Sequence, residues 1–312
     1  PDLRTMGGEP PPALDADFRD LLNDVLFKQD WYRDYRRGSG WEDLPFVGRF
    51  RGNESPETVA ADIRDILELD VRPIGSVRGP DALLTALSER AEAAGIWVMR
   101  NGVVGNNPHR PLSVDMFRGF ALSDPVVPLV FINGRDAKAG QVFTLAHELA
   151  HIWFGQSGVS DPLRTASTEI GQDQDMEVAC NRTAEAVLMP ATAVEGFWAS
   201  DVSLEENVEH GVRFFRVSRA AVALRAYHFG MVQQEDLSGF LEAERERWRR
   251  EQTRGDNAES GGDFHKTAPA RHGNRYLRAV VGSAMEGELL MRDAAALLNV
   301  KPKTIIKMYY QQ

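Results

Sequence analysis

The stretch "FTLAHELAHIWFG", from Phe143 to Gly155, places two histidines four residues apart, with a glutamate directly after the first. On a helix, residues i and i+4 lie on one face, so His147 and His151 can both reach one metal ion. Glu148 is displaced around the helix and can address a water molecule on that metal. The flanking residues are mostly apolar, which predicts a buried helix in which charged groups are paired or metal-bound.

A zinc site of this kind needs a third protein ligand. No histidine follows His151 until His210, so we look for a carboxylate from the next helix. The candidates in the following segment are Glu169, Asp173, Asp175, Glu177 and Glu185. We predict Glu177, where the sequence turns apolar, as the third ligand, with Asn181 one turn further on or Glu185 supporting the ligands by hydrogen bonds.

Apolar periodicity and capping residues predict a mostly helical α+β chain with a small sheet. Helices are expected over 15–38, 55–69, 79–95, 136–155, 175–190, 218–230 and 237–252. Short apolar runs at Ile96–Arg100, Asp115–Ser123 and Pro128–Gly134 predict three strands. The long polar segment Gly155–Gln174 is expected to be a functional or mobile loop.

Composition narrows the class of protein. The chain has 312 residues, is 43% hydrophobic and carries a net charge of −10, which argues against a general nucleic-acid binder. Its single cysteine, Cys180, excludes an internal disulfide and fits a reducing compartment. No apolar run approaches the ~18 residues of a membrane span, and the N-terminal sequence lacks the apolar core of a signal peptide. We therefore expect a cytoplasmic protein with no membrane contact.

Three sequence blocks carry a family resemblance. "FTLAHELAHIWFG", "EVACNRTAEAVLMP" (177–190) and "FFRVSRAAVALRAYHFGMV" (214–232) follow one another as they do in the ImmA/IrrE family of zinc metallopeptidases, which this chain resembles from Val130 to Val232. The family usually has alanine where this chain has Cys180, and either small residue suits a buried helix. We expect the Cys180 thiol to be inert packing.

The resemblance implies a gluzincin-like fold and a metallo-endopeptidase activity. It implies Zn²⁺ held by His147, His151 and Glu177, with Glu148 as the catalytic acid and base. It also implies a protein substrate, a transcriptional repressor cleaved at one bond, and hence a role in transcription regulation and stress response. A donor to the oxyanion should complete the site; the candidates are His210, Arg225, Tyr227 and His228, each of which is more typically structural.

We divide the chain into four segments. They are an N-terminal helical and linker segment (1–55), a metallopeptidase domain (56–252), a linker (253–270) and a small basic helical C-terminal module (271–312). Residues 266–312 carry a net charge of +5, against −15 for the remainder. We favour docking of the basic module on the acidic body over binding to a partner of its own.

An alternative from another class is a regulatory binding protein that senses a metal, a ligand or a partner without useful turnover. "RDAAALLNVKPKTIIKMYY" also fits a helix-turn-helix, in which Lys301, Lys303 and Lys307 would contact DNA phosphates. Longer bacterial members of the family often carry a helix-turn-helix DNA-binding domain before a segment like "PDLRT". This chain starts at that segment and without Met, so we expect the natural protein to begin upstream.

Overall fold

The computed structural model of the protein describes residues 16–69, 77–160, 172–252 and 264–310. Its centre is a four-stranded sheet with strand order β1–β3–β2–β4. The strands are β1 (Trp97–Asn101), β2 (Gly119–Leu122), β3 (Leu129–Asn133) and β4 (Gly158–Ser160). β1 runs parallel to β3, whereas β2 is antiparallel to both β3 and β4. The α+β class and the three predicted strands are confirmed, and β4 adds a short edge strand inside the segment predicted as a loop.

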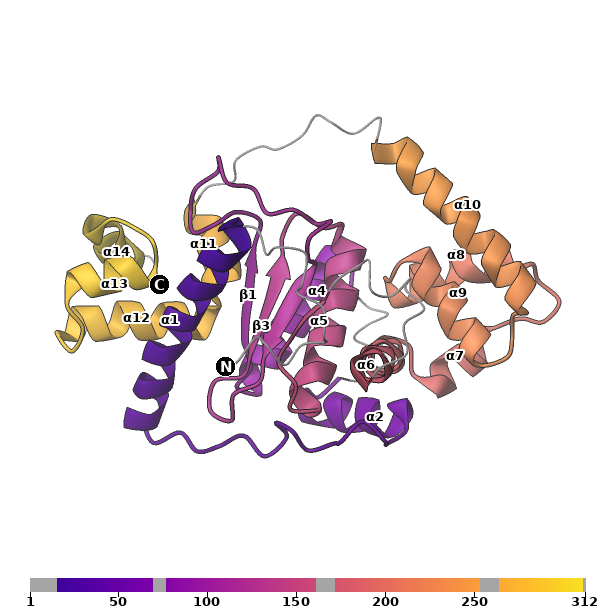
Figure 1. Ribbon diagram of the computed structural model, residues 1–312, viewed down its shortest axis with the longest axis horizontal. Coiled ribbons are helices and arrows are strands. Elements are labelled where there is room, and N and C mark those ends of the chain that lie inside the picture. The colour runs from indigo at the N-terminus through magenta and orange to yellow at the C-terminus, as the bar shows by residue number, and fades with distance from the viewer. Residues whose placement is uncertain (1–15, 70–76, 161–171, 253–263, 311–312) are drawn as a thin grey trace.

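Helices cover both faces of this sheet (Figure 1). They are α1 (Ala16–Gly38), α2 (Pro56–Ile66), α4 (Pro80–Ala93), α5 (Lys138–Trp153), α6 (Gln172–Leu188), α7 (Ala191–Phe197), α8 (Leu204–Phe215), α9 (Arg219–His228), α10 (Gln234–Gln252), α11 (Phe264–His272), α12 (Asn274–Glu286), α13 (Met291–Leu297) and α14 (Pro302–Tyr309). Where the structure describes the chain, none of these helices is both long enough and apolar enough to cross a membrane.

Side chains alternate across the sheet because successive strand residues point to opposite faces. In β3, Val130 and Ile132 join the core formed with α5, whereas Leu129 and Phe131 join the core on the other face. β1 divides in the same way, with Val98 on the first face and its neighbours on the second. The sheet therefore separates two apolar cores, and only the first of them contains α5.

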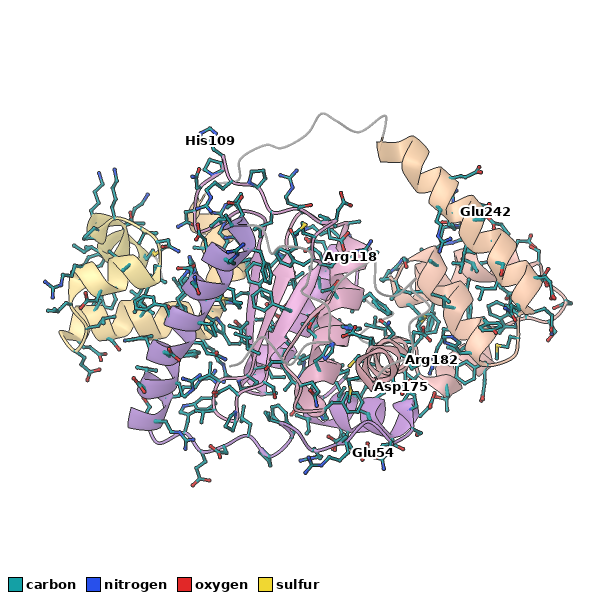
Figure 2. The ribbon with its side chains drawn as sticks, in the orientation of Figure 1. Glu54, His109, Arg118, Asp175, Arg182 and Glu242 are labelled. Atoms are coloured by element: carbon teal, nitrogen blue, oxygen red, sulfur yellow. The ribbon has the colours of Figure 1, made fainter. Side chains whose placement is uncertain are left out.

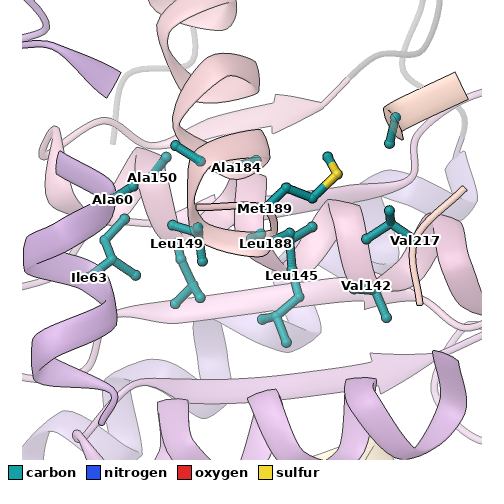
Figure 3. Packing of buried hydrophobic residues seen from close by; sticks show 14 of the residues in the cluster. Ala60, Ile63, Val142, Leu145, Leu149, Ala150, Ala184, Leu188, Met189 and Val217 are labelled. Atoms are coloured by element: carbon teal, nitrogen blue, oxygen red, sulfur yellow. The ribbon is translucent and has the colours of Figure 1, made fainter. Parts of the chain in front are cut away.

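The first core is built around α5, which lies between the sheet, α2, α4 and α6. Figure 3 shows Leu145 and Leu149 of α5 among Ile63 of α2 and Leu188 of α6. Every residue from Thr144 to Trp153 is buried. An apolar helix enclosed on all sides can keep polar groups only if they have partners, which makes α5 the natural place for a built site.

The second core joins the two ends of the chain. Phe18 and Tyr32 of α1 pack with Tyr276 of α12 and with Trp97 of β1, and the rings of Tyr32 and Tyr276 lie 5.2 Å apart. The indole Nε1 of Trp97 donates to the backbone carbonyl of His272, at 2.6 Å. Figure 1 shows α1 lying beside α11 and α12. The C-terminal helices thus dock on the sheet, while the four-segment domain division stays a prediction.

The end of the segment predicted as a linker, 253–270, is helical. Residues Phe264–His272 form α11, which packs against β1 even though its sequence contains Pro269. Ala268 and His272 are buried there. The helix forms because it docks on the sheet, a tertiary effect that the polar sequence does not reveal. The short helices α7 and α8 were also outside the prediction.

A buried carboxylate links the body of the protein to α12. Glu92, at the end of α4, accepts a hydrogen bond from the backbone N–H of Asn274, at 2.9 Å. Asn274 is the first residue of α12, so Glu92 satisfies one of the N–H groups that a helix start leaves unpaired. Burial raises the pKa of Glu92 from its ordinary 4.5 to about 7, against smaller opposing effects of the Asn274 hydrogen bond and Arg275.

Glu92 should make stability depend on pH. The folded protein holds the Glu92 proton more tightly than the unfolded chain does, so the free energy of unfolding should fall as pH rises from about 4.5 to about 7. Glu92→Gln keeps an acceptor but cannot ionise. Urea unfolding should find it more stable than the wild type at pH 8, by up to about 3 kcal/mol, and nearly equal at pH 4. Glu235→Gln, exposed on α10 (Gln234–Gln252), is the control; an equal response of both variants would contradict the role of Glu92.

Candidate metal centre

The centre lies between α5 and α6, which pack against each other next to the sheet. His147 and His151 are both buried on α5, and Glu177 is half-buried on α6. Small residues line both helices in the same core, including Ala150 of α5 and Ala184 of α6 (Figure 3). Without large side chains at these positions, the two helix backbones can come close enough for their polar groups to meet.

Three side chains converge on one point. The two imidazole Nε2 atoms of His147 and His151 are 3.0 Å apart. The carboxylate oxygens of Glu177 lie 3.3 Å from each of them, Oε2 from His147 and Oε1 from His151. A tetrahedral ion bound at 2.0–2.1 Å keeps its ligand atoms about 3.3 Å apart. The spacing of the three groups therefore fits one small divalent cation.

The hydrogen bonding of His147 supports this assignment. Its Nδ1 lies 2.9 Å from the amide oxygen Oδ1 of Asn181. Because a carbonyl oxygen only accepts, Nδ1 carries the proton and Nε2 turns its lone pair toward His151 and Glu177. A neighbour that fixes the tautomer of a metal-binding histidine is the usual arrangement in metal sites. His147, His151 and Glu177 thus form a group that fits a metal site.

The electrostatics of the group favour bound positive charge. Burial acts to lower the pKa of His147, but the hydrogen bond to Glu177 and the charges of Glu148 and Glu177 outweigh it and raise that pKa. Burial acts to raise the pKa of Glu177, but His147 and His151 hold it well below its ordinary value. The negative charge that stabilises a protonated imidazole would also stabilise a metal cation bound by these residues.

Glu148 is fully buried beside this group. Its charge raises the pKa of both His147 and Cys180, as expected of a carboxylate close to His147 and to α6. A Cβ atom added at Gly119 of β2 would lie 3.2 Å from Oε1 of Glu148 and 2.5 Å from Thr144. Gly119 therefore leaves the space in which Glu148 sits. Sequence reasoning missed this residue, although a single glycine within a strand pattern signals close approach of another group.

The comparisons with known proteins agree with this geometry. Residues 91–227 match the model of the Peptidase M78 family, described as the IrrE N-terminal-like domain. This segment belongs to the ImmA/IrrE family. Residues 273–311 match a second model, a domain of unknown function, DUF8813. The search of curated proteins found no match. The ImmA/IrrE match spans β1 to α9 and so includes the whole candidate centre, which makes this a peptidase-type domain.

The remaining third-ligand candidates in the ImmA/IrrE segment lie apart from the centre or outside the described residues. Asp175 is exposed at the start of α6 (Figure 2). Glu185 is buried two turns beyond Glu177, and its Oε2 lies 2.6 Å from Nδ1 of His228. Glu169 falls outside the described residues, as does the side chain of Asp173. Glu185 is thus paired with His228, and Asn181 alone of the two supporting candidates contacts a histidine of the centre.

Two of the candidate oxyanion donors, Arg225 and His228, have other partners. The Arg225 guanidinium donates to the Met189 carbonyl at 3.1 Å and to the Glu57 carboxylate at 3.3 Å, and it lies over the Phe229 ring. It lines a surface cavity between α2, α6 and α9 that does not include the histidines. His210 is exposed on α8, and Tyr227 is half-buried on α9. No contact of these three side chains with the metal-binding group is seen in the described part of the chain.

The thiol of Cys180 lies close to the centre but is unreactive. Cys180 is fully buried on α6, between Glu177 and Asn181 in sequence. Burial raises its pKa well above the ordinary value, and the charges of Glu177 and Glu148 raise it further. The thiolate that nucleophilic or metal-binding chemistry requires is therefore disfavoured at neutral pH.

Removing the amide of Asn181 should weaken metal binding. Asn181→Ala frees the His147 ring to change tautomer and orientation, so we expect a 10- to 100-fold loss of affinity for Zn²⁺. Competition against a chromogenic chelator measures this loss. Val178→Ala, a half-exposed position on the same helix, should leave the affinity unchanged. If both variants bind Zn²⁺ as the wild type does, Asn181 has no part in holding the ligand.

Adding a methyl group at Gly119 should disturb the centre. The new Cβ would lie 2.5 Å from Thr144 Cγ2 and 2.8 Å from the Phe131 carbonyl, so strand and helix must separate. We expect Gly119→Ala to lower the free energy of unfolding by about 1–3 kcal/mol. Gly282→Ala, on α12 with no atom within 4 Å of its added Cβ, is the matched control and should be neutral or stabilising. Chemical unfolding of both variants decides the question.

Proposed function

We propose that the protein is a zinc-dependent endopeptidase that hydrolyses one peptide bond in a protein substrate. The observation that carries this proposal is the convergence of His147, His151 and Glu177 within 4.8 Å of one another, in a domain of a peptidase family. Two neutral imidazoles and one carboxylate are a ligand set typical of catalytic zinc, which leaves a fourth position open for water or substrate.

In this proposal, the three ligands hold the ion and Glu148 moves the proton. A bound zinc ion would polarise the scissile carbonyl and lower the pKa of its water. Glu148 would take up the proton released when water attacks the carbonyl and would deliver it to the leaving nitrogen, as a general base and then a general acid. The Glu148 side chain is buried where α5 passes over Gly119 of β2, which keeps the carboxylate in one place. Asn181 keeps the Nε2 lone pair of His147 directed at the ion.

The substrate that we propose is a transcriptional repressor. The support is the resemblance to ImmA/IrrE peptidases, for which repressor cleavage relieves repression of stress-response or mobile-element genes. Such a substrate would place the protein in the cytoplasm. We assign no oxyanion donor, since Arg225 is held by Met189 and Glu57 and His228 pairs with Glu185.

Glu148→Gln tests the chemistry directly. It keeps the size of the side chain but removes the base, so we expect a loss of cleavage rate of about 10²- to 10⁴-fold with zinc content unchanged. The assay incubates zinc-loaded protein with repressors from the same genome and follows cleavage by mass spectrometry. Elemental analysis gives the metal content.

Asp175→Asn is the matched carboxylate-to-amide control, because Asp175 is exposed on α6 away from the ligands. It should cleave at the wild-type rate. Equal cleavage by the Glu148→Gln variant would contradict the role of Glu148. If neither the wild type nor the control cleaves any repressor while zinc is bound, the alternative of a metal- or ligand-sensing regulator is favoured instead.

A further inference from the structure

The last three helices form a compact unit with a short turn between the final two. α12 contacts both α13 and α14, and α13 contacts α14. α13 ends at Leu297 and α14 begins at Pro302, so four residues connect them. Asn299 in this turn has a left-handed backbone, with φ 52°, which reverses the chain sharply. Two short helices joined by a four-residue turn and braced by a third helix have the form of a helix-turn-helix.

The final helix has one buried face and one exposed face. Ile305 and Met308 of α14 are buried in the core shared with α12. Lys303, Ile306, Lys307 and Tyr310 are all exposed and follow the 0, 3, 4, 7 spacing of one helix face. Tyr310 is 78% exposed and Ile306 43% exposed, although large apolar side chains are usually covered. We call these four residues the α14 face.

The α14 face is positively charged and its lysines are available. Lys303 and Lys307 form no ion pair with any residue in the described ranges, and neither does Lys301 at the turn. The acidic residues of the module, Glu286, Glu288 and Asp293, all precede the turn. Like charges without internal partners are arranged to meet negative charge from outside the molecule.

The module is attached to the body through other surfaces. The Asn299 side chain donates to the Asp24 carboxylate of α1 at 3.2 Å, and the Asn106 side chain donates to the Asn299 carbonyl at 2.7 Å. In Figure 1, α13 and α14 lie at the opposite end of the molecule from α8, α9 and α10. The module therefore docks on the body without covering the α14 face, so the acidic body is not the partner of these lysines.

We propose that residues 274–310 are a helix-turn-helix module that binds double-stranded DNA, with α14 lying in the major groove. The groove is about 12 Å wide and admits one helix. Lys303 and Lys307 would contact phosphates, while Ile306 and Tyr310 would contact base edges and thymine methyl groups. Tyr309 and Tyr310 are both exposed, but their rings meet edge to face at an interplanar angle of 78°. They therefore offer no flat platform for stacking successive bases, which argues against a single-stranded nucleic acid. This module and the metal centre are separate, so neither proposal depends on the other.

Fluorescence anisotropy with the full chain and a labelled 20-base-pair duplex of mixed sequence tests the module. We expect binding at low salt, with a dissociation constant in the micromolar range, that weakens as salt rises. Lys303→Glu combined with Lys307→Glu should weaken binding at least tenfold, and the neutral Lys303→Ala with Lys307→Ala should lower the slope of log K against log salt by about 2. Because both lysines are exposed, neither change threatens folding, which circular dichroism confirms.

The matched control reverses two charges elsewhere. Arg213→Glu with Arg247→Glu changes the net charge by the same amount on α8 and α10, where both side chains are exposed, and should alter affinity less than twofold. An equal loss in both double variants would mean that bulk charge alone governs binding and would overturn the proposal. Absence of duplex binding at low salt, tighter binding to a single strand, or binding only to an acidic peptide such as polyglutamate would overturn it as well.

Discussion

The close approach of α5 and α6 is the constraint on which the rest of this protein depends. α5 is enclosed by the sheet, α2, α4 and α6, and within that enclosure it holds two imidazoles and a carboxylate. Burying such groups is unfavourable unless each finds a partner of opposite character. Glu177 meets both histidines from α6, and Asn181 meets His147 one turn later. The buried histidines of α5 are therefore tolerated because α6 presents Glu177 and Asn181 to them at the right spacing.

Local spacing explains how much of this centre the sequence predicts. His147, Glu148 and His151 lie within one and a half turns of a single helix, so helix geometry alone relates them. Glu177 is harder to predict from the sequence, because the prediction requires knowing which helix faces α5. Asp175 lies only two residues earlier but about 200° around the helix, which is why it is exposed while Glu177 reaches the histidines.

Features that depend on distant contacts were not predictable from the sequence. Gly119 matters only because β2 passes close to Glu148, and nothing within the strand specifies which helix lies above it. α11 forms in a polar segment containing Pro269 because it docks on β1. Arg225 was a reasonable candidate by its position on α9, yet it is engaged by Met189 and Glu57. In each case a tertiary contact, and no local preference, decides the outcome.

The packing of α1 with the C-terminal helices has a consequence for how the chain is made. Phe18 and Tyr32 are synthesised before the sheet, whereas Tyr276, which packs against Tyr32, is synthesised after it. Until then, the apolar side of α1 and the outer face of the sheet have no cover, and such surfaces are prone to aggregate. Contacts between residues so far apart in sequence also form slowly. The second core can therefore close only after α12 has been made, so a chain terminated before α12 would be a poor folder even where its metal-binding residues are all present.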